Sequence, residues 1–143
     1  MITRSRSEFQ LEMGLTPMER QHMKVKNFKE LHVWQKGIEI VDLVYELTSR
    51  FPADERYGLA RHVQKTAVSI PSNIAEGFVR HHTREYQQFC RIALGSCAEL
   101  ETQLIIARRR KYINAEQFAT LDEWLDHENR MLVNLIKSLN NNL

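Results

Sequence analysis

Two groups of side chains in this sequence have the types and spacing needed for binding or proton transfer. The first is a polar line that runs through the segment SIPSNIAEG, with Ser69, Asn73, Glu76 and Arg80 at spacings of 4, 3 and 4. On a helix this spacing places all four on one face. The line favours polar contacts between helices or subunits, and a ligand or nucleic-acid site is the alternative. Catalysis is disfavoured because no nucleophile–base pair accompanies it.

The second group is the basic run Arg108, Arg109, Arg110 and Lys111, at the end of the third predicted helix. Cations at a helix C-terminus complement the helix macrodipole, and this structural role is the first interpretation. The alternative is a patch that contacts phosphates. Further charge would then come from Arg61, Lys65, Arg80, Arg84 and Arg91. Base-specific readout is disfavoured because no aromatic-platform motif accompanies the run.

Other residues that often carry chemistry lack the spacing they need. A di-metal site in a helical bundle requires two Glu-x-x-His motifs, and the one present is Glu19 with His22. We therefore expect no metal, no other cofactor and no enzymatic activity. Cys90 and Cys97 lie seven residues apart on one predicted helix, too far for a disulfide, and are interpreted as core residues. Glu128 falls at a core position, where it is predicted to pair with a basic side chain or backbone amides, or to be exposed at a subunit interface.

Four amphipathic helices are expected to position these residues. Apolar side chains recur every three or four residues over about 27–50, 54–80, 83–111 and 114–139. Short turns between the segments favour an all-α, antiparallel, up-down-up-down four-helix bundle. The apolar stripe stays in phase across Pro71, so the second segment is predicted to be one helix with a proline kink.

The first helix is predicted to begin at Asn27, which would form a capping box with Glu30. Asp54, Thr83 and Asn114 are the predicted caps of the other three. The predicted core-facing stripe of the first helix is Leu31, Trp34, Ile38, Val41 and Tyr45. That of the second is Leu59, Val63, Ala67, Ile70, Ile74 and Phe78. The third and fourth stripes are Tyr86, Cys90, Ala93, Cys97, Leu100 and Leu104, then Phe118, Leu121, Leu125, Leu132, Leu135 and Leu139.

Composition and length set the remaining limits. The 143 residues suit one domain, and 5 Gly with 3 Pro argue against a turn-rich β fold. We expect a cytoplasmic protein with no membrane contact, because the sequence lacks a long apolar run and a secretory leader. Residues 1–26 lack periodicity and are predicted to be a tail, either disordered or loosely helical, before a bundle over 27–143. Alternatively the native chain starts at Met23.

Charge is distributed unevenly along the chain. Residues 56–111 carry ten basic side chains against four acidic ones, and residues 112–143 carry two against five. Such a dipolar subunit could attract an anion on one face, or it could pair with a copy of itself.

Several segments resemble one bacterial family in the same order along the chain. They are FKELHVWQKG (28–37), FPADERYGL (51–59), AVSIPSNIAEG (67–77), REYQQFCRIALGSCAELETQL (84–104) and KYI (111–113). Through them the chain is similar, over about residues 27–140, to the four-helix-bundle or 23S rRNA-intervening-sequence proteins. The resemblance implies an antiparallel bundle that assembles into a ring, typically a homopentamer, without catalytic residues. A related group serves diversity-generating retroelements, which implies RNA or DNA and a reverse transcriptase as partners.

The resemblance also assigns a polar signature, interpreted as structural or as part of an interface. Its members are Ser69, Pro71, Asn73, Glu76, Gly77, Arg80, Glu99 and Glu101. The segment ARRRKYI departs from the family, which usually has a Gly and fewer cations there. We therefore expect a non-enzymatic, oligomeric accessory protein that binds nucleic-acid backbone. Its candidate contacts are Arg108, Arg109, Arg110, Lys111, Arg61, Lys65 and Arg84. The alternative is a structural or protein-partner scaffold ring with no nucleic-acid role.

Overall fold

The computed structural model describes residues 25–141, which form four long helices and two short 3₁₀ turns. The helices are α3 (His32–Thr48), α4 (Leu59–Val79), α5 (Thr83–Arg109) and α6 (Ala115–Asn140). The turns are η1 (Phe28–Glu30) and η2 (Ala53–Glu55). The described residues contain no strand, and the all-α four-helix fold is confirmed. The predictions for residues 1–24, including a start at Met23, lie outside the described residues, and the predicted domain boundary stays a prediction.

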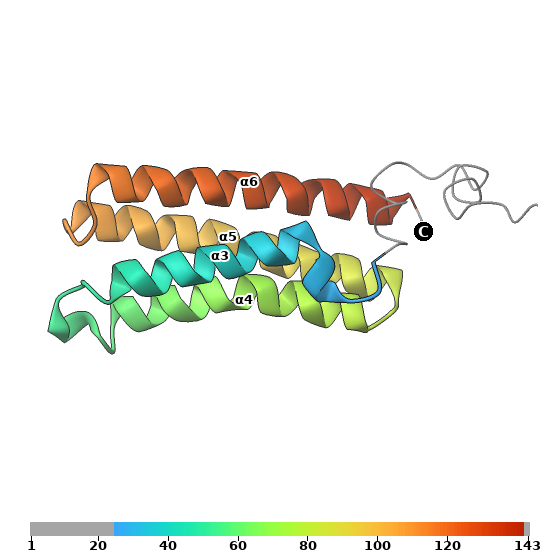
Figure 1. Cartoon of the computed structure of the whole chain (residues 1–143), viewed down its shortest axis with the longest axis horizontal. Coiled ribbons are helices and arrows are strands. Elements are labelled where there is room, and N and C mark those ends of the chain that lie inside the picture. The colour runs from blue at the N-terminus through green and yellow to red at the C-terminus, as the bar shows by residue number, and fades with distance from the viewer. Residues whose placement is uncertain (1–24, 142–143) are drawn as a thin grey trace, which may run out of the picture.

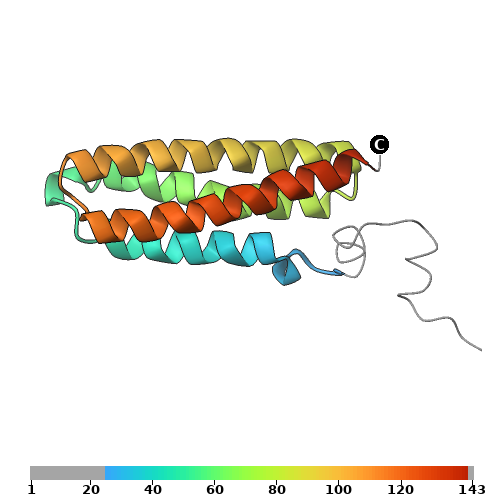
Figure 2. The same cartoon turned by 90° about the horizontal axis from the view of Figure 1, so that it is seen from above.

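Consecutive helices run in opposite directions and lie side by side in both views (Figure 1, Figure 2). Each helix packs against the next one in the chain, and α3 also packs against α6. This arrangement places α3 diagonally across from α5. The four helices bury one continuous apolar core, in which Ile40, Ile70, Leu100 and Leu132 have no exposed surface.

The start of the first helix differs from the prediction. The Asn27 side chain accepts a hydrogen bond from the backbone N–H of Lys29 at 3.0 Å, so it caps η1 rather than α3. Glu30 accepts from the backbone N–H of Lys26, so the predicted capping box is wrong. Leu31 then adopts an extended backbone (φ −71°, ψ 126°), and α3 begins at His32.

The core-facing side of α3 is also displaced by one position. Its buried residues are Val33, Gly37, Ile40, Val44, Leu47 and Thr48. Of the predicted stripe, Leu31 is buried in the core, but the other four positions lie on the adjacent face. There Trp34, Ile38 and Val41 are half-buried and Tyr45 is 49% exposed. Helix α3 therefore carries two neighbouring apolar faces, of which one faces the core of the bundle.

Helix α4 starts later than predicted but keeps its predicted stripe. It begins at Leu59, because the segment around Asp54 forms η2, and its N-cap is Gly58 with no side-chain bond. Most of its stripe is buried, and the helix is unbroken at Pro71. The bend at Pro71 stays a prediction. A Cβ at Gly77 would lie 2.8 Å from Phe89 Cβ, so α5 crosses α4 closely there.

The last two helices match their predictions more closely. All six stripe positions of α5 are buried, including Cys90 and Cys97, which are free cysteines. Its N-cap is His82 rather than Thr83. In α6 five of the six stripe positions are buried and Phe118 is half-buried. The capping box of Asn114 is confirmed: its Oδ1 accepts from the N–H of Gln117 at 2.8 Å, and Gln117 Oε1 accepts in return at 2.9 Å.

Candidate nucleic-acid interface

Helix α5 ends in a tight turn that displays the four cations of the basic run. Arg110 is the C-cap, and Lys111 follows with a φ of 64°, in the left-handed region where glycine is usual. The turn is closed because the N–H of Lys111 donates to Arg108 O at 3.0 Å and that of Tyr112 to Ala107 O at 2.9 Å. All four cationic side chains are exposed.

Aromatic and apolar contacts hold this turn against the neighbouring loop. The Tyr112 ring packs against Phe51, with ring centroids 5.3 Å apart. Phe51 follows α3, and the next residue after Tyr112, Ile113, is buried in the core. The anchored Tyr112 and Ile113 therefore fix the direction in which the cations project.

Two of the other candidate contacts lie at the same end of the bundle. Arg61 and Lys65 are exposed on the first two turns of α4, which begins where α5 ends (Figure 1). Arg84 lies on the first turn of α5, at the opposite end. The structure therefore brings Arg61 and Lys65 to the basic run and separates Arg84 from it.

Sequence reasoning missed two further cations at this end, Arg50 and Arg56, which are exposed on the connection between α3 and α4. The signal was available, because an antiparallel bundle places the α3–α4 loop beside the end of α5. We call Arg50, Arg56, Arg61, Lys65 and Arg108–Lys111 the basic end. Residues 46–66 and 105–120, which surround it, carry eight Lys and Arg against four Asp and Glu.

The cations of the basic run are not neutralised within the part of the chain that the structure describes. Arg108, Arg109, Arg110 and Lys111 form no ion pair with any residue of 25–141. Among the cations of the basic end, Arg50 alone has an acidic partner within the described residues, with its Nη2 3.8 Å from Glu46 Oε1. Exposed, unpaired cations attract phosphate oxygens and release counterions when they bind them.

The polar line of α4 makes contacts of a different kind. The Ser69 hydroxyl lies 2.7 Å from that of Ser96 on α5, and Asn73 Nδ2 donates to Ser69 O at 2.7 Å. Arg80 donates to Glu76 Oε1 from two nitrogens, at 3.1 and 2.7 Å. The Glu76 carboxylate raises the pKa of Arg80. These bonds tie α4 to itself and to α5, which favours the structural interpretation of the line.

The remaining signature residues lie apart from the basic end. Gly77 and Pro71 occupy close packing positions on α4. Glu99 is exposed on α5 and accepts from Gln103 Nε2 at 3.4 Å. The functional role of these residues, whether in the fold or in an interface, stays a prediction.

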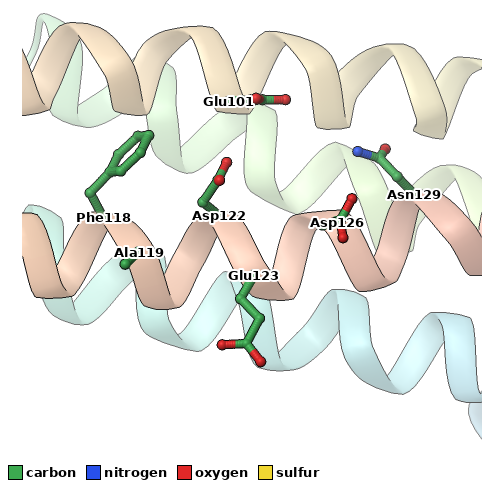
Figure 3. Close-up of a pocket in the computed structure, with 7 residues that line it drawn as sticks. All are labelled: Glu101, Phe118, Ala119, Asp122, Glu123, Asp126 and Asn129. Carbon is green, nitrogen blue, oxygen red and sulfur yellow. The ribbon is translucent and has the colours of Figure 1, made fainter.

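Glu101 contributes to an acidic groove of about 370 Å³ between α5 and α6 (Figure 3). The side chains of Asp122, Glu123 and Asp126 line it from α6, with Phe118 at one end. Asp126 also pairs with Arg130 at 3.1 Å. The chain thus carries a basic end and a separate acidic groove, in keeping with the uneven charge of the sequence.

Two further properties concern metals and membranes. Within residues 25–141, no three His, Cys, Asp or Glu side chains are grouped so that they could hold a metal ion. In the same region, none of the helices combines the length and the apolar character needed to cross a bilayer.

Comparisons with known proteins place the chain in a family. A model of the 23S rRNA-intervening sequence protein family matches residues 29–134. A solved structure of a protein with unknown function, from the S23 ribosomal protein family of Bacteroides thetaiotaomicron, is similar with a TM-score of 0.69 and 23% sequence identity. The similarity covers 73% of this chain and 95% of that chain, and it concerns the fold alone. No curated protein sequence matches this chain. With its four-helix fold and a match over most of its length, the chain belongs to the 23S rRNA-intervening sequence protein family.

Proposed function

We propose that this protein is a non-enzymatic, oligomeric accessory protein that binds the phosphate backbone of RNA or DNA through its basic end. The observation that carries the proposal is the state of Arg108–Lys111, which are all exposed and unpaired within residues 25–141. Arg61 and Lys65 add charge at the same end. Binding of this kind is electrostatic and independent of sequence.

One aromatic side chain at the basic end favours single strands over duplexes. Tyr57, between η2 and α4, is 78% exposed and follows Arg56 directly. An exposed ring beside cations can stack on an unpaired base, and such stacking contributes about 1–3 kcal/mol per base. A single ring supports no reading of base identity, so the proposed binding remains nonspecific.

We further propose that several copies form a closed ring, typically a homopentamer, as the family resemblance implies. A supporting surface is the outer face of α3 and α4, where a groove of about 240 Å³ lies between the helices. It is lined by Trp34, Ile38, Val41, Val68, Pro71, Ser72 and Ala75. A contiguous exposed apolar surface of this kind marks an interface, and opposite charges on one subunit let copies attract each other. A ring would repeat each basic end and convert weak contacts into avidity.

The second candidate function is a structural or protein-partner scaffold ring with no nucleic-acid role. The apolar α3–α4 face favours it, because that face supports assembly whether or not the basic end binds anything. For either function we propose a cytoplasmic protein with a protein partner such as a reverse transcriptase, on the strength of the resemblance. A pull-down from the native host would identify that partner.

The direct test measures binding to a mixed-sequence single-stranded RNA and to a duplex over a range of salt concentrations. We expect the affinity to fall steeply with salt and to be higher for the single strand. Replacing Arg108–Lys111 by Gln should weaken binding at least tenfold and flatten the salt dependence. Arg84→Gln with Arg91→Gln is the control, because it removes two charges from the same helix away from the basic end. Absence of binding at low salt would leave the scaffold function.

Assembly is tested separately by light scattering. We expect an oligomer at micromolar concentration and its dissociation on Val41→Glu, which places a charge in the α3–α4 groove. Thr102→Glu on the exposed face of α5 is the control and should leave the size unchanged. A wild-type monomer at this concentration would refute the ring.

A further inference from the structure

Glu128 is a buried carboxyl group that the proposed function does not use. It lies in the middle of α6 with no exposed surface, and neither carboxyl oxygen accepts a hydrogen bond from residues 25–141. The sequence predicted a basic partner, backbone amides or exposure, and within the subunit this prediction is wrong. A buried, unpaired carboxylate is very costly, so a neutral carboxylic acid is the form that this site favours.

Residues from two other helices meet Glu128 at one point. A Cβ built on Gly37 of α3 would lie 3.1 Å from Glu128 Oε2. This added Cβ of Gly37 would also lie 3.2 Å from the Cβ and 3.4 Å from the Cδ of Pro71 on α4. The carboxyl group and the proline ring therefore face each other across a glycine whose missing side chain leaves room for both.

Pro71 leaves an acceptor without its usual donor at this place. Proline has no backbone N–H, so the helical hydrogen bond to the carbonyl of Ala67, four residues earlier, is absent. Ala67 is fully buried, so water cannot replace the missing bond. A buried carbonyl without a donor is destabilising, and the proline ring sits beside that carbonyl in any helix.

We propose that Glu128 is held as a neutral carboxylic acid whose O–H donates a hydrogen bond to the Ala67 carbonyl that Pro71 leaves unpaired. Helix α6 thereby supplies, across the core, the hydrogen bond that helix α4 lacks. The proposal is independent of nucleic-acid binding and concerns every subunit of the assembly.

The surrounding charges are consistent with a neutral acid. Burial raises the pKa of Glu128 to about 8, while Lys36 lowers it and Glu39 raises it. Lys36 already donates to Glu39 at 3.0 Å and lies 4.6 Å from the Trp124 ring. On α5 the facing group is Cys97, whose pKa burial raises to about 12. From α4 the facing residue is Pro71, which does not titrate.

The sign of the pH dependence follows from the pKa values. The pKa of Glu128 in the folded chain, about 8, exceeds its ordinary value of 4.5. Folding therefore takes up a proton at pH values between 4.5 and 8. The contribution of Glu128 to stability is complete below pH 4.5 and is lost as pH rises to 8. Within this window the folding equilibrium constant should fall by about tenfold per pH unit relative to a variant that cannot titrate.

The first experiment compares urea unfolding of the full chain and of Glu128→Gln at pH 6 and pH 9, at one protein concentration. Gln keeps the shape and an N–H donor but does not titrate. We expect the free energy of unfolding of the full chain to fall relative to that of Glu128→Gln as pH rises. At pH 9 we expect Glu128→Gln to be the more stable of the two. The same comparison for Glu123→Gln, an exposed position on α6, should show no such shift. If the free energies of unfolding of the wild type and of Glu128→Gln change equally between pH 6 and pH 9, the proposal is overturned.

The second experiment tests the acceptor. Replacing Glu128 by Leu removes the donor, and we expect the unfolding equilibrium constant at pH 6 to rise at least tenfold. Pro71→Ala restores the N–H that bonds Ala67, so in that background the same replacement should have a much smaller effect. An equal effect of Glu128→Leu in both backgrounds would overturn the donation to Ala67. If Glu128→Leu is as stable as the wild type at pH 6, the proposed hydrogen bond to Ala67 is also overturned.

Discussion

The core and the basic end of this bundle use charge in opposite ways. In the core, Glu128 is fully buried, and neither of its carboxyl oxygens accepts a hydrogen bond from residues 25–141. At the basic end, Arg108–Lys111 are exposed and form no ion pair within the same range. A charge removed from water costs free energy of folding, whereas an exposed charge is screened and leaves stability almost unchanged. Core residues should therefore govern stability, and residues of the basic end should govern binding.

The backbone shows the same contrast. In the core, Gly77 allows α4 and α5 to approach so closely that an added Cβ would meet Phe89 at 2.8 Å. At the basic end, Lys111 adopts a φ of 64°, where glycine would be less strained. The core therefore has glycine where packing requires it, and the basic end has a lysine where the backbone favours glycine.

The largest predicted effect contrasts two isoleucines. Ile74→Ala should lower the free energy of unfolding by about 3 kcal/mol, because the side chain is fully buried and its loss leaves a cavity. Ile106→Ala, on the last turns of α5, should change it by about 0.5 kcal/mol or less, because that side chain is 42% exposed. Urea denaturation of both variants measures the difference. A cost at Ile106 close to that at Ile74 would indicate that another copy of the chain covers this end.

The next prediction contrasts two helical glycines. Gly77→Ala should destabilise by about 2 kcal/mol, because overpacking against the α5 backbone outweighs the gain in helix propensity. Gly95→Ala should stabilise by about 1 kcal/mol, since an added Cβ there meets no atom of residues 25–141 within 4 Å apart from its own turn of helix. Thermal or urea unfolding distinguishes the two signs. If Gly95→Ala destabilises, a second subunit approaches α5 at this position.

A smaller effect tests the strain at Lys111. Lys111→Gly should raise the free energy of unfolding by about 1 kcal/mol, because glycine adopts a positive φ without steric cost. Lys111→Gln removes the same charge but keeps the strain, so its stability should stay close to that of the wild type. Both variants should weaken nucleic-acid binding equally. If Lys111→Gly is no more stable than Lys111→Gln, the turn is not strained by its lysine.

The sequence predicts the fold class and most core positions, and its errors have one main physical source. Helix α3 has two apolar faces, and Trp34, Ile38 and Val41 are as apolar as the residues that are buried. Periodicity finds an apolar face, but it does not tell which of two apolar faces packs into the core of the bundle. The start of α3 failed similarly, because Asn27 and Glu30 have the spacing of a capping box while Asn27 caps a 3₁₀ turn.

The candidate site was predicted in part. The run Arg108–Lys111 is visible in the sequence, and the antiparallel topology brings Arg61 and Lys65 beside it. Arg84 lies on the same helix as the run but about 36 Å away along its axis, at 1.5 Å per residue. The absence of a donor to the Glu128 carboxyl oxygens could not be predicted, because it depends on which side chains of three other helices meet Glu128 in the core.

The smallest predicted effect tests whether the basic end contributes to the stability of the fold. Arg109→Gln should cost about 0.3 kcal/mol at low ionic strength, through the lost interaction of its charge with the α5 macrodipole. In 0.5 M salt this cost should vanish, because salt screens charges at an exposed helix end. Urea unfolding at the two salt concentrations measures both values. A cost above about 1 kcal/mol that persists in high salt would contradict the contrast, since exposed surface substitutions rarely exceed about 0.5 kcal/mol. Such a result would mean that Arg109 is buried in the assembled protein, and that the run serves subunit contacts rather than phosphate binding.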